Sequence, residues 1–233
     1  MNARNPLNIG ASARAMSNFG LHRLRVVNPF EAAFREARSA VGAASVMTSA
    51  EEYKTLADAI ADCSLVVGTT AVGRRDLQHP LKRVEVGAAA IRAHLATGRC
   101  ALLFGSEKFG LSNKELSHCH WLLHIPTRDE HLSMNLGQAV AVCLYELTRD
   151  GTASPEPERG SPASSGEVER VIDALFDALR ASDYPKLNSS DSFEAAVRRF
   201  VGRLQLQRGD AEFLLGILRQ IVWKLNHRAP PTR

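Results

Sequence analysis

The chain has 233 residues, enough for one core and a small appendage, and its 45% hydrophobic and 23% charged content is that of a globular protein. No apolar run reaches the ~20 residues of a membrane-spanning helix, and no basic-then-apolar signal opens the chain, so we expect a cytoplasmic protein with no membrane partner. The four cysteines lie singly in apolar stretches, which favours buried reduced thiols over disulfides. A net charge of +4 is compatible with nucleic-acid binding but does not establish it.

The stretch NPLNIGASARAM, residues 5–16, predicts a turn that leads into a helix. Asn5, Pro6 and Gly10 are turn residues, and the small residues of 11–15 favour a helix. Arg14 then follows Gly10 by about one helical turn. On this stretch alone, a surface turn with one solvated arginine is the alternative interpretation.

Four short apolar runs predict strands, at residues 23–29, 64–70, 100–106 and 121–126. Their nearly continuous apolar character indicates that both faces of the sheet are covered. Between them, Ser49 with Glu52 and Ser112 with Glu115 have the spacing of capping boxes and predict helix starts. This alternation predicts an α/β fold with a mostly parallel sheet, helices on both faces, and ligands at the carboxyl ends of the strands.

The C-terminal third predicts further helices. One runs from about Asn135 to Arg149, and three more lie between residues 167 and 226. Leu214, Leu218, Ile221 and Leu225 form a stripe that we expect to pack in a core. Residues 151–166 are rich in Pro, Gly and Ser and predict a linker. We therefore expect an α/β domain over 1–150, a linker over 151–166 and a small helical extension over 167–233.

Three loops combine glycines with polar side chains at strand ends or helix starts. The first is the opening stretch. In the second, LLFGSEKFGLSN, Gly105 and Gly110 flank Glu107; in the third, IPTRDEHLSMNLGQAVAV, Ser133 and Asn135 precede a helix. The segment VVGTTA is a weaker fourth. Each loop offers backbone N–H groups and close approach, as a ligand site needs.

NPLNIGASARAM, FGSEKFGLSN and SMNLGQAVAVCLYEL, in this order, resemble the three motifs of the SpoU/TrmH branch of the SPOUT RNA methyltransferases. With the C-terminal helices, the chain is most similar to TrmJ-type tRNA ribose methyltransferases. The resemblance implies a C-terminal deep trefoil knot that binds S-adenosyl-L-methionine, and a homodimer with a shared active site. It also implies 2′-O-ribose methylation of RNA, with the tRNA anticodon loop as expected target. Ribosomal RNA as substrate, or a non-catalytic RNA-binding knotted dimer, are the alternatives.

The resemblance also implies roles for single residues. Arg14 is the proposed base for the ribose 2′-hydroxyl, although a guanidinium is normally a donor and could instead clamp a phosphate and stabilise the alkoxide. Asn8 would position the ribose or Arg14, Glu107 would accept ordering hydrogen bonds, and Ser133 and Asn135 would contact ribose or cofactor. Alternatively, Glu107 is a solvated loop carboxylate and Ser133 or Asn135 caps a helix. The cofactor would be lined by Thr69, Thr70, Ala71, Gly105, Ile125, Leu132, Ser133 and Met134.

Arginines are the candidates for RNA contact, through phosphates and shape rather than base sequence. They are Arg23, Arg25, Arg74, Arg75, Arg199 and Arg203, with Lys82, Arg83 and Arg198 as further candidates. Each could equally be an ordinary solvated residue, and the C-terminal helices could instead serve dimerisation or packing.

Two other kinds of site are disfavoured by the sequence. His118, Cys119, His120 and His124 suggest a metal, but their alternation places them on different faces, so we expect none. GSEKFGLS lacks the Gly-Lys-hydroxyl ending of a phosphate-binding P-loop. The family also carries a strand before the first motif, where this sequence has only residues 1–4, so we expect the natural reading frame to be longer.

Overall fold

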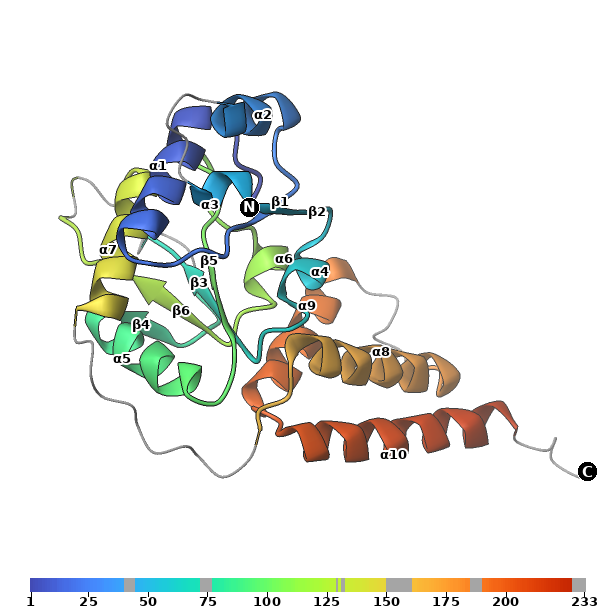
Figure 1. Ribbon diagram of the computed structural model, residues 1–233. Helices are drawn as coiled ribbons and strands as arrows, with labels where there is room; N and C mark the ends of the chain where they lie inside the picture. The colour runs from blue at the N-terminus through green and yellow to red at the C-terminus, as the bar shows by residue number, and fades with distance from the viewer. Residues whose placement is uncertain are drawn as a thin grey trace, which may run out of the picture.

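The computed structural model describes residues 1–39, 45–71, 77–128, 130, 133–149, 161–184 and 190–227. Its strands form two parallel sheets (Figure 1). In the smaller, β1 (Arg25–Val27) pairs with β2 (Glu51–Tyr53). In the larger, the order is β4 (Leu81–Arg83), β6 (Trp121–His124), β3 (Leu65–Thr69) and β5 (Cys100–Leu103), with every neighbouring pair parallel. The predicted parallel α/β fold is therefore confirmed.

Helices cover both faces of the larger sheet, as predicted. Val66 and Leu122 point to one face and pack with α4 and α6, whereas Val67 and Leu123 point to the other and pack with α5 and α7. The two clusters follow from the alternation of side chains along each strand. The helices are α1 (Pro6–Asn18), α2 (Glu31–Ser39), α3 (Ser45–Thr48), α4 (Leu56–Ile60), α5 (Val84–Leu95), α6 (Asn113–Leu116), α7 (Leu136–Thr148), α8 (Ser165–Ala181), α9 (Ser190–Arg203) and α10 (Arg208–Asn226).

The first stretch is helical earlier than its sequence suggests. The Asn5 side chain accepts a hydrogen bond from the Leu7 N–H at 2.9 Å, and Pro6 occupies the first helical position. Proline is tolerated there because the N–H it lacks has no partner within the helix. The predicted turn through Gly10 is therefore wrong, since Gly10 lies inside α1. This helix lies along α7 (Figure 1).

One of the two predicted capping boxes exists. At α6, the Ser112 N–H donates to Glu115 at 2.6 Å, and the Glu115 N–H donates to Ser112 at 3.2 Å. The box predicted at Ser49 and Glu52 is wrong, because Glu52 lies in strand β2 and α4 begins after Thr55, which caps it. The strands β2 and β4 were not predicted.

The C-terminal helices α8, α9 and α10 share a core of their own, which includes Val171, Phe176, Val201 and Leu218. Ser164 and Glu167 form a capping box at the start of α8. The last residues of the predicted linker are therefore helical. Residues 151–160 of that linker lie outside the described part of the chain. The predicted core stripe on α10 is wrong at Ile221, whose side chain is 43% exposed.

These C-terminal helices contact the α/β part of the chain at α4 and the residues that follow it. The Ser165 hydroxyl donates to the Cys63 carbonyl at 2.6 Å, and the Gly166 N–H donates to the Ala61 carbonyl at 2.8 Å. All four cysteines are free thiols, and burial raises the pKa of the Cys143 thiol to about 12. No helix in the described ranges is long and apolar enough to cross a membrane.

The trefoil knot that the resemblance implies stays a prediction. Among the described residues, β1 pairs with β2 alone and β5 with β3 alone. Near the ends of these two strands, the Met1 amine donates to the Phe104 carbonyl at 2.8 Å and the Asn2 N–H donates to the Val27 carbonyl at 3.0 Å.

Candidate active site

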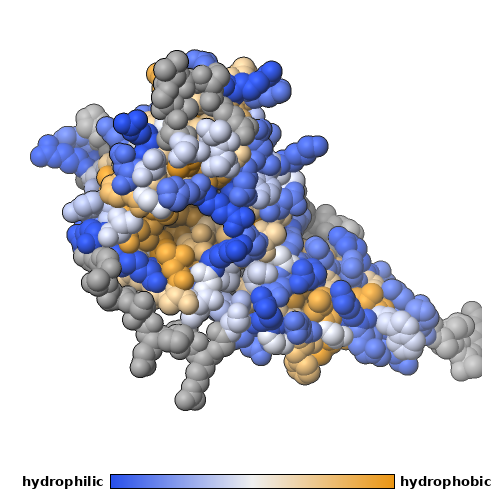
Figure 2. Space-filling view, in the orientation of Figure 1, coloured by the Kyte–Doolittle hydropathy of each residue, from blue (hydrophilic) through white to orange (hydrophobic). Residues whose placement is uncertain are grey.

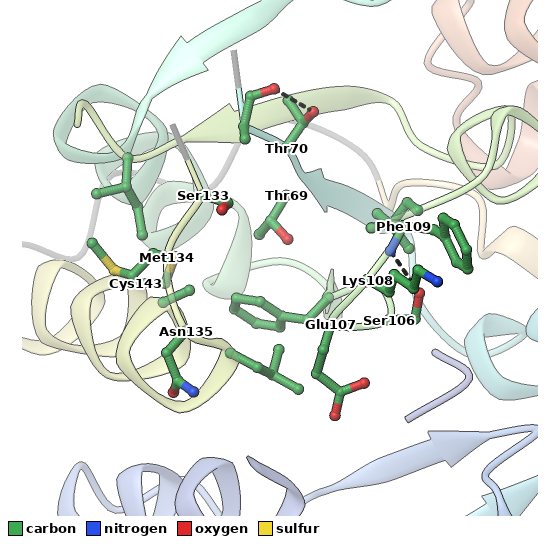
Figure 3. Close-up of a pocket in the computed structure, with 18 of the residues that line it drawn as sticks. Thr69, Thr70, Ser106, Glu107, Lys108, Phe109, Ser133, Met134, Asn135 and Cys143 are labelled. Carbon is green, nitrogen blue, oxygen red and sulfur yellow. Dashed lines mark hydrogen bonds between the residues drawn. The ribbon is translucent and has the colours of Figure 1, made fainter. Parts of the chain in front are cut away.

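A cavity of about 690 Å³ opens where β3, β5 and β6 end at their carboxyl ends. Loops after each of these strands, the start of α7 and Asn8 of α1 form its walls. Figure 2 shows it as a hollow with a hydrophobic floor and hydrophilic side chains around it. In Figure 3, Ser133, Met134 and Asn135 lie on one side, Ser106 to Phe109 on the other, and Thr69 and Thr70 between them. This is the place at which parallel α/β sheets bind ligands.

The loop after β5 is closed on itself by its two glycines. Ser106 and Gly110 exchange backbone hydrogen bonds of 3.2 and 2.9 Å. Gly110 has φ +66°, a conformation that favours glycine, and a Cβ on Gly105 would lie 2.0 Å from the Gly110 carbonyl carbon. The tight loop holds Glu107 at its tip, toward the start of α1.

Three side chains from distant parts of the sequence form a hydrogen-bonded row beside the cavity. Asn135 donates its amide to the Asn8 side-chain oxygen at 2.8 Å, and Asn8 donates its own amide to Glu107 at 3.4 Å. Glu107 also accepts from the backbone N–H groups of Asn5 at 3.2 Å and Arg4 at 3.4 Å. The row therefore connects the loop after β5, the N-terminal end of α1 and the start of α7.

Hydrogen bonds keep Glu107 ionised. Partial burial would raise the pKa of its carboxyl, but the N–H groups and the Asn8 amide that donate to it outweigh burial and lower the pKa below its ordinary value. Both carboxylate oxygens are occupied in this way. Glu107 is thus suited to positioning α1, as an acceptor, rather than to removing a proton.

Asn135 caps α7 with one side-chain atom and holds Asn8 with the other. Its side-chain oxygen accepts from the Gly137 N–H at 3.0 Å and the Gln138 N–H at 3.4 Å, which caps α7. Its amide nitrogen is left to hold Asn8. Ser133 is exposed, lines the cavity two residues earlier, and does not cap this helix.

The structure brings most of the predicted cofactor residues to this cavity. Those that line it are Thr69, Thr70, Ala71, Gly105, Ile125, Ser133 and Met134, whereas Leu132 lies outside the described residues. Sequence reasoning missed part of the apolar wall, formed by Phe104, Leu123, Leu136, Ala139 and Cys143. A signal for two of these was present, because Ala139 and Cys143 follow Asn135 at successive four-residue intervals and so share its helix face.

Arg14 is the predicted site residue that does not join the others. It is exposed, lies outside the cavity lining, and makes no hydrogen bond or ion pair with any residue that the structure describes. Helical periodicity places it on the same face of α1 as Leu7, whose side chain is 79% exposed, and away from Asn8. Within one chain, therefore, Arg14 points out of the molecule and not into the cavity.

The predicted RNA-binding arginines that the structure describes have two different environments. Arg25 is 14% exposed and donates to Asp62 at 2.5 and 2.8 Å, and Arg23 also pairs with Asp62, at 3.3 Å. This placement argues against Arg25 as a phosphate contact. Arg74 and Arg75 lie outside the described residues.

The remaining pair, Arg199 and Arg203, lies on α9 near the segment before β4. Partial burial lowers the pKa of His79, and the positive charges of Arg199 and Arg203 lower it further, so both arginines lie close to this histidine. The neighbouring Arg198 is instead committed to Glu169 and Glu194. The positive charges of two arginines of the C-terminal helices thus act on His79, a residue of the α/β part.

No group of three metal-ligating side chains occurs among the described residues. His120 accepts a hydrogen bond from the Val66 N–H through Nδ1 at 3.1 Å, and Cys119 is buried against Gly68. These contacts serve the packing of β3 against β6.

Residues 1–145 match the SpoU rRNA Methylase family. The chain belongs to this family of SpoU methylases. Every described residue that lines the cavity falls within the matched range.

Individual relatives cover the C-terminal helices as well. The tRNA (cytidine/uridine-2′-O-)-methyltransferase TrmJ of Escherichia coli strain K12 is 34% identical over 221 residues, which span 92% of this chain and 89% of that protein. The crystal structure of TrmJ from Z. mobilis ZM4 superposes with a TM-score of 0.79 at 30% identity, over 94% of this chain and 96% of that one. A probable methylase family protein from Haemophilus influenzae Rd KW20 matches with a TM-score of 0.56 at 26% identity, over 97% of each chain. The likeness to these SpoU methylases is therefore not confined to the cavity.

Proposed function

We propose that this protein transfers a methyl group from S-adenosyl-L-methionine to a ribose 2′-hydroxyl of tRNA, in the anticodon loop. The observation that carries the proposal is the row of Asn135, Asn8 and Glu107 fixed beside a ligand-sized cavity. A chain 34% identical to a tRNA 2′-O-methyltransferase along 92% of its length supports the substrate class.

The cavity fits the cofactor in its chemistry. Phe104, Leu123 and Ile125 give it an apolar wall suited to an adenine ring, and the loops after β3 and β5 offer backbone groups and hydroxyls at its rim. S-adenosyl-L-methionine, when bound, supplies an electrophilic methyl group on a sulfonium cation. We assign its binding to the lining residues Thr69, Thr70, Ala71, Gly105, Ile125, Ser133 and Met134, with Leu132 as a further candidate.

The protein's part in the reaction is chiefly orientation. In this reaction the ribose oxygen would form a bond to the methyl carbon as the carbon–sulfur bond breaks, with the bonding electron pair staying on sulfur, and the hydroxyl proton would pass to a water molecule. Because opposite charges are neutralised in this step, a dry and well-oriented site favours it. Asn8 and Asn135 hold each other in place and offer amide groups toward the ribose, and Glu107 fixes Asn8.

A second copy of the chain supplies Arg14 in this proposal. Arg14 and the exposed Leu7 share the outward face of α1, so a partner packed on that face would bring its own cavity to this arginine. A guanidinium stays protonated, so Arg14 would donate to an RNA phosphate and to the developing alkoxide. The homodimer is thus part of the proposed active site, and not only a packing arrangement.

Arg199 and Arg203 are the RNA contacts that we retain from the described chain. They lie together near His79 and are not committed to an ion pair among the described residues, in contrast to Arg198. Arg74 and Arg75, which precede His79 closely in sequence, stay proposed as RNA contacts.

The test is methyl transfer from labelled S-adenosyl-L-methionine to bulk tRNA and, separately, to ribosomal RNA. Wild type is compared with Arg14→Ala and with Arg35→Ala, an exposed arginine on α2 that has no assigned role. We expect label in tRNA with wild type and Arg35→Ala, and a loss of ~100-fold or more with Arg14→Ala, as for other donors to a developing oxyanion.

Three results would contradict the proposal in whole or in part. Label in ribosomal RNA alone would move the substrate to the rRNA alternative. Cofactor binding by wild type with transfer to neither RNA would favour the non-catalytic RNA-binding dimer. Retained transfer by Arg14→Ala would leave the substrate class intact but remove Arg14 from the active site.

A further inference from the structure

The last helix, α10, carries an apolar stripe that the protein's own core does not cover. Phe213, Ile217 and Ile221 follow one another at four-residue intervals, with exposed fractions of 73%, 42% and 43%. The face of α10 that packs in the C-terminal core is a different one, with Ala211 and Leu218 buried. Figure 2 shows hydrophobic surface among hydrophilic side chains over the C-terminal helices. The stripe takes no part in the cavity or in the row of Asn135, Asn8 and Glu107.

Opposite charges mark the two ends of this stripe. Asp210 precedes Phe213 by three residues and Lys224 follows Ile221 by three, so helical periodicity places both on the same face as Ile217. Both are exposed, and neither makes an ion pair within the described ranges. The stripe thus has an acidic end, an apolar middle and a basic end.

This order is self-complementary under a two-fold axis. If two α10 helices pack antiparallel with Ile217 opposite Ile217, Phe213 of each lies opposite Ile221 of the other. The same register places Asp210 opposite Lys224 at both ends. A parallel pair would instead place like charges together at each end. We propose that a second copy of this chain packs on the α10 stripe in the antiparallel register centred on Ile217, at an interface distinct from the one proposed on α1.

An RNA partner would not satisfy the stripe in the same way. Asp210 would face the phosphates at one end, and only Lys224 would be attractive. The arginines that lie near His79 belong to α9 and are separate from the stripe. A second copy pairs both ends of the stripe and buries its middle, so it is the occupant that the charge pattern favours.

The first test is cross-linking of Ile217→Cys by a short bis-maleimide in the full-length protein, without RNA or cofactor. Native thiols give little background, because Cys63, Cys119 and Cys143 are buried and Cys100 is largely covered. The matched control is Arg219→Cys, exposed and on the opposite side of the same helix. We expect Ile217→Cys to form covalent dimers in high yield and Arg219→Cys to form few.

Charge reversal then tests the register. Asp210→Lys places like charges at both ends, and should raise the protein concentration for half-maximal cross-linking at position 217 by about tenfold, equivalent to ~1.4 kcal/mol. Adding Lys224→Asp to Asp210→Lys should restore the wild-type concentration. Far-UV circular dichroism of each variant checks that α10 is still folded.

The outcomes separate this proposal from the methyltransferase assignment, because neither RNA nor activity enters the measurement. Equal cross-linking of Ile217→Cys and Arg219→Cys would show non-specific contact and overturn it, as would no cross-linking at position 217. Failure of the double variant to recover would overturn the antiparallel register. Absence of the cross-link, with the thiol at position 217 shielded from a mono-maleimide by tRNA in a separate experiment, would identify RNA as the occupant instead.

Discussion

At the scale of single residues, Asn135 joins a structural role to a functional one. Its oxygen caps α7 and its nitrogen holds Asn8. Asn135→Asp keeps the acceptor that caps the helix but loses the donor to Asn8, whereas Asn135→Ala loses both. We expect Asn135→Ala to lower the free energy of unfolding by ~1 kcal/mol, and Asn135→Asp to change it little. Methyl transfer should fall in both variants, and urea unfolding with a tRNA methylation assay measures the two effects.

The comparison of these two variants isolates the amide. Both variants lose the hydrogen bond to Asn8, so methyl transfer should fall in both. Only Asn135→Asp should lose activity without losing stability. Wild-type methyl transfer by Asn135→Asp would show that the Asn135–Asn8 hydrogen bond is not needed, and that Asn135 acts as a helix cap only.

At the scale of elements, the contact between α1 and α7 sets the distance between Asn8 and Asn135. A Cβ on Gly137 would lie 2.6 Å from the Ala11 Cβ, closer than real contacts allow, so the helices would have to separate. We expect Gly137→Ala to destabilise the protein by about 1–3 kcal/mol, as overpacking does, and to weaken methyl transfer by lengthening the Asn8–Asn135 hydrogen bond. Thermal unfolding and the methylation assay measure both.

Gly202→Ala is the matched control for this helix contact. Gly202 lies in α9 with nothing within 4 Å of its added Cβ, so the substitution should be neutral or slightly stabilising. Normal activity in Gly137→Ala would mean that the two helices can move apart without disturbing the site.

Elements were predictable where a local pattern agreed with the tertiary contacts. The four apolar runs form strands because their apolar side chains pack into the hydrophobic clusters on the faces of the sheets. The strands β2 and β4, with sequences EEY and LKR, could not be recognised, since three mostly charged residues have no apolar pattern and exist as strands only through their pairing with β1 and β6. The same pairing explains the wrong capping box at Ser49, because Glu52 lies in β2 opposite Val26.

At the scale of the whole molecule, the cavity was predictable because parallel strands end at one edge and carry their loops to it. Motif order identified Asn8, Glu107 and Asn135, but not that they touch, since that depends on how α1 packs against α7. The outward position of Arg14 could not be derived from spacing along the chain. Whether Arg14 reaches the cavity depends on which face of α1 packs against α7, and only the folded structure shows this.

A shared active site makes a prediction for mixed variants. If Arg14 acts on the partner's cavity, Arg14→Ala and Asn135→Ala damage opposite halves of each site, and a mixed dimer keeps one intact site. Two nearly inactive variants, unfolded together and refolded in equal amounts, should then recover about a quarter of wild-type methyl transfer, the share expected from random isologous pairing. Each variant refolded alone is the control. Native mass spectrometry of differently tagged chains checks that mixed dimers have formed. If they have formed and activity does not recover, Arg14 acts on the cavity of its own chain. The outward face of α1 would then have to turn toward that cavity when RNA binds.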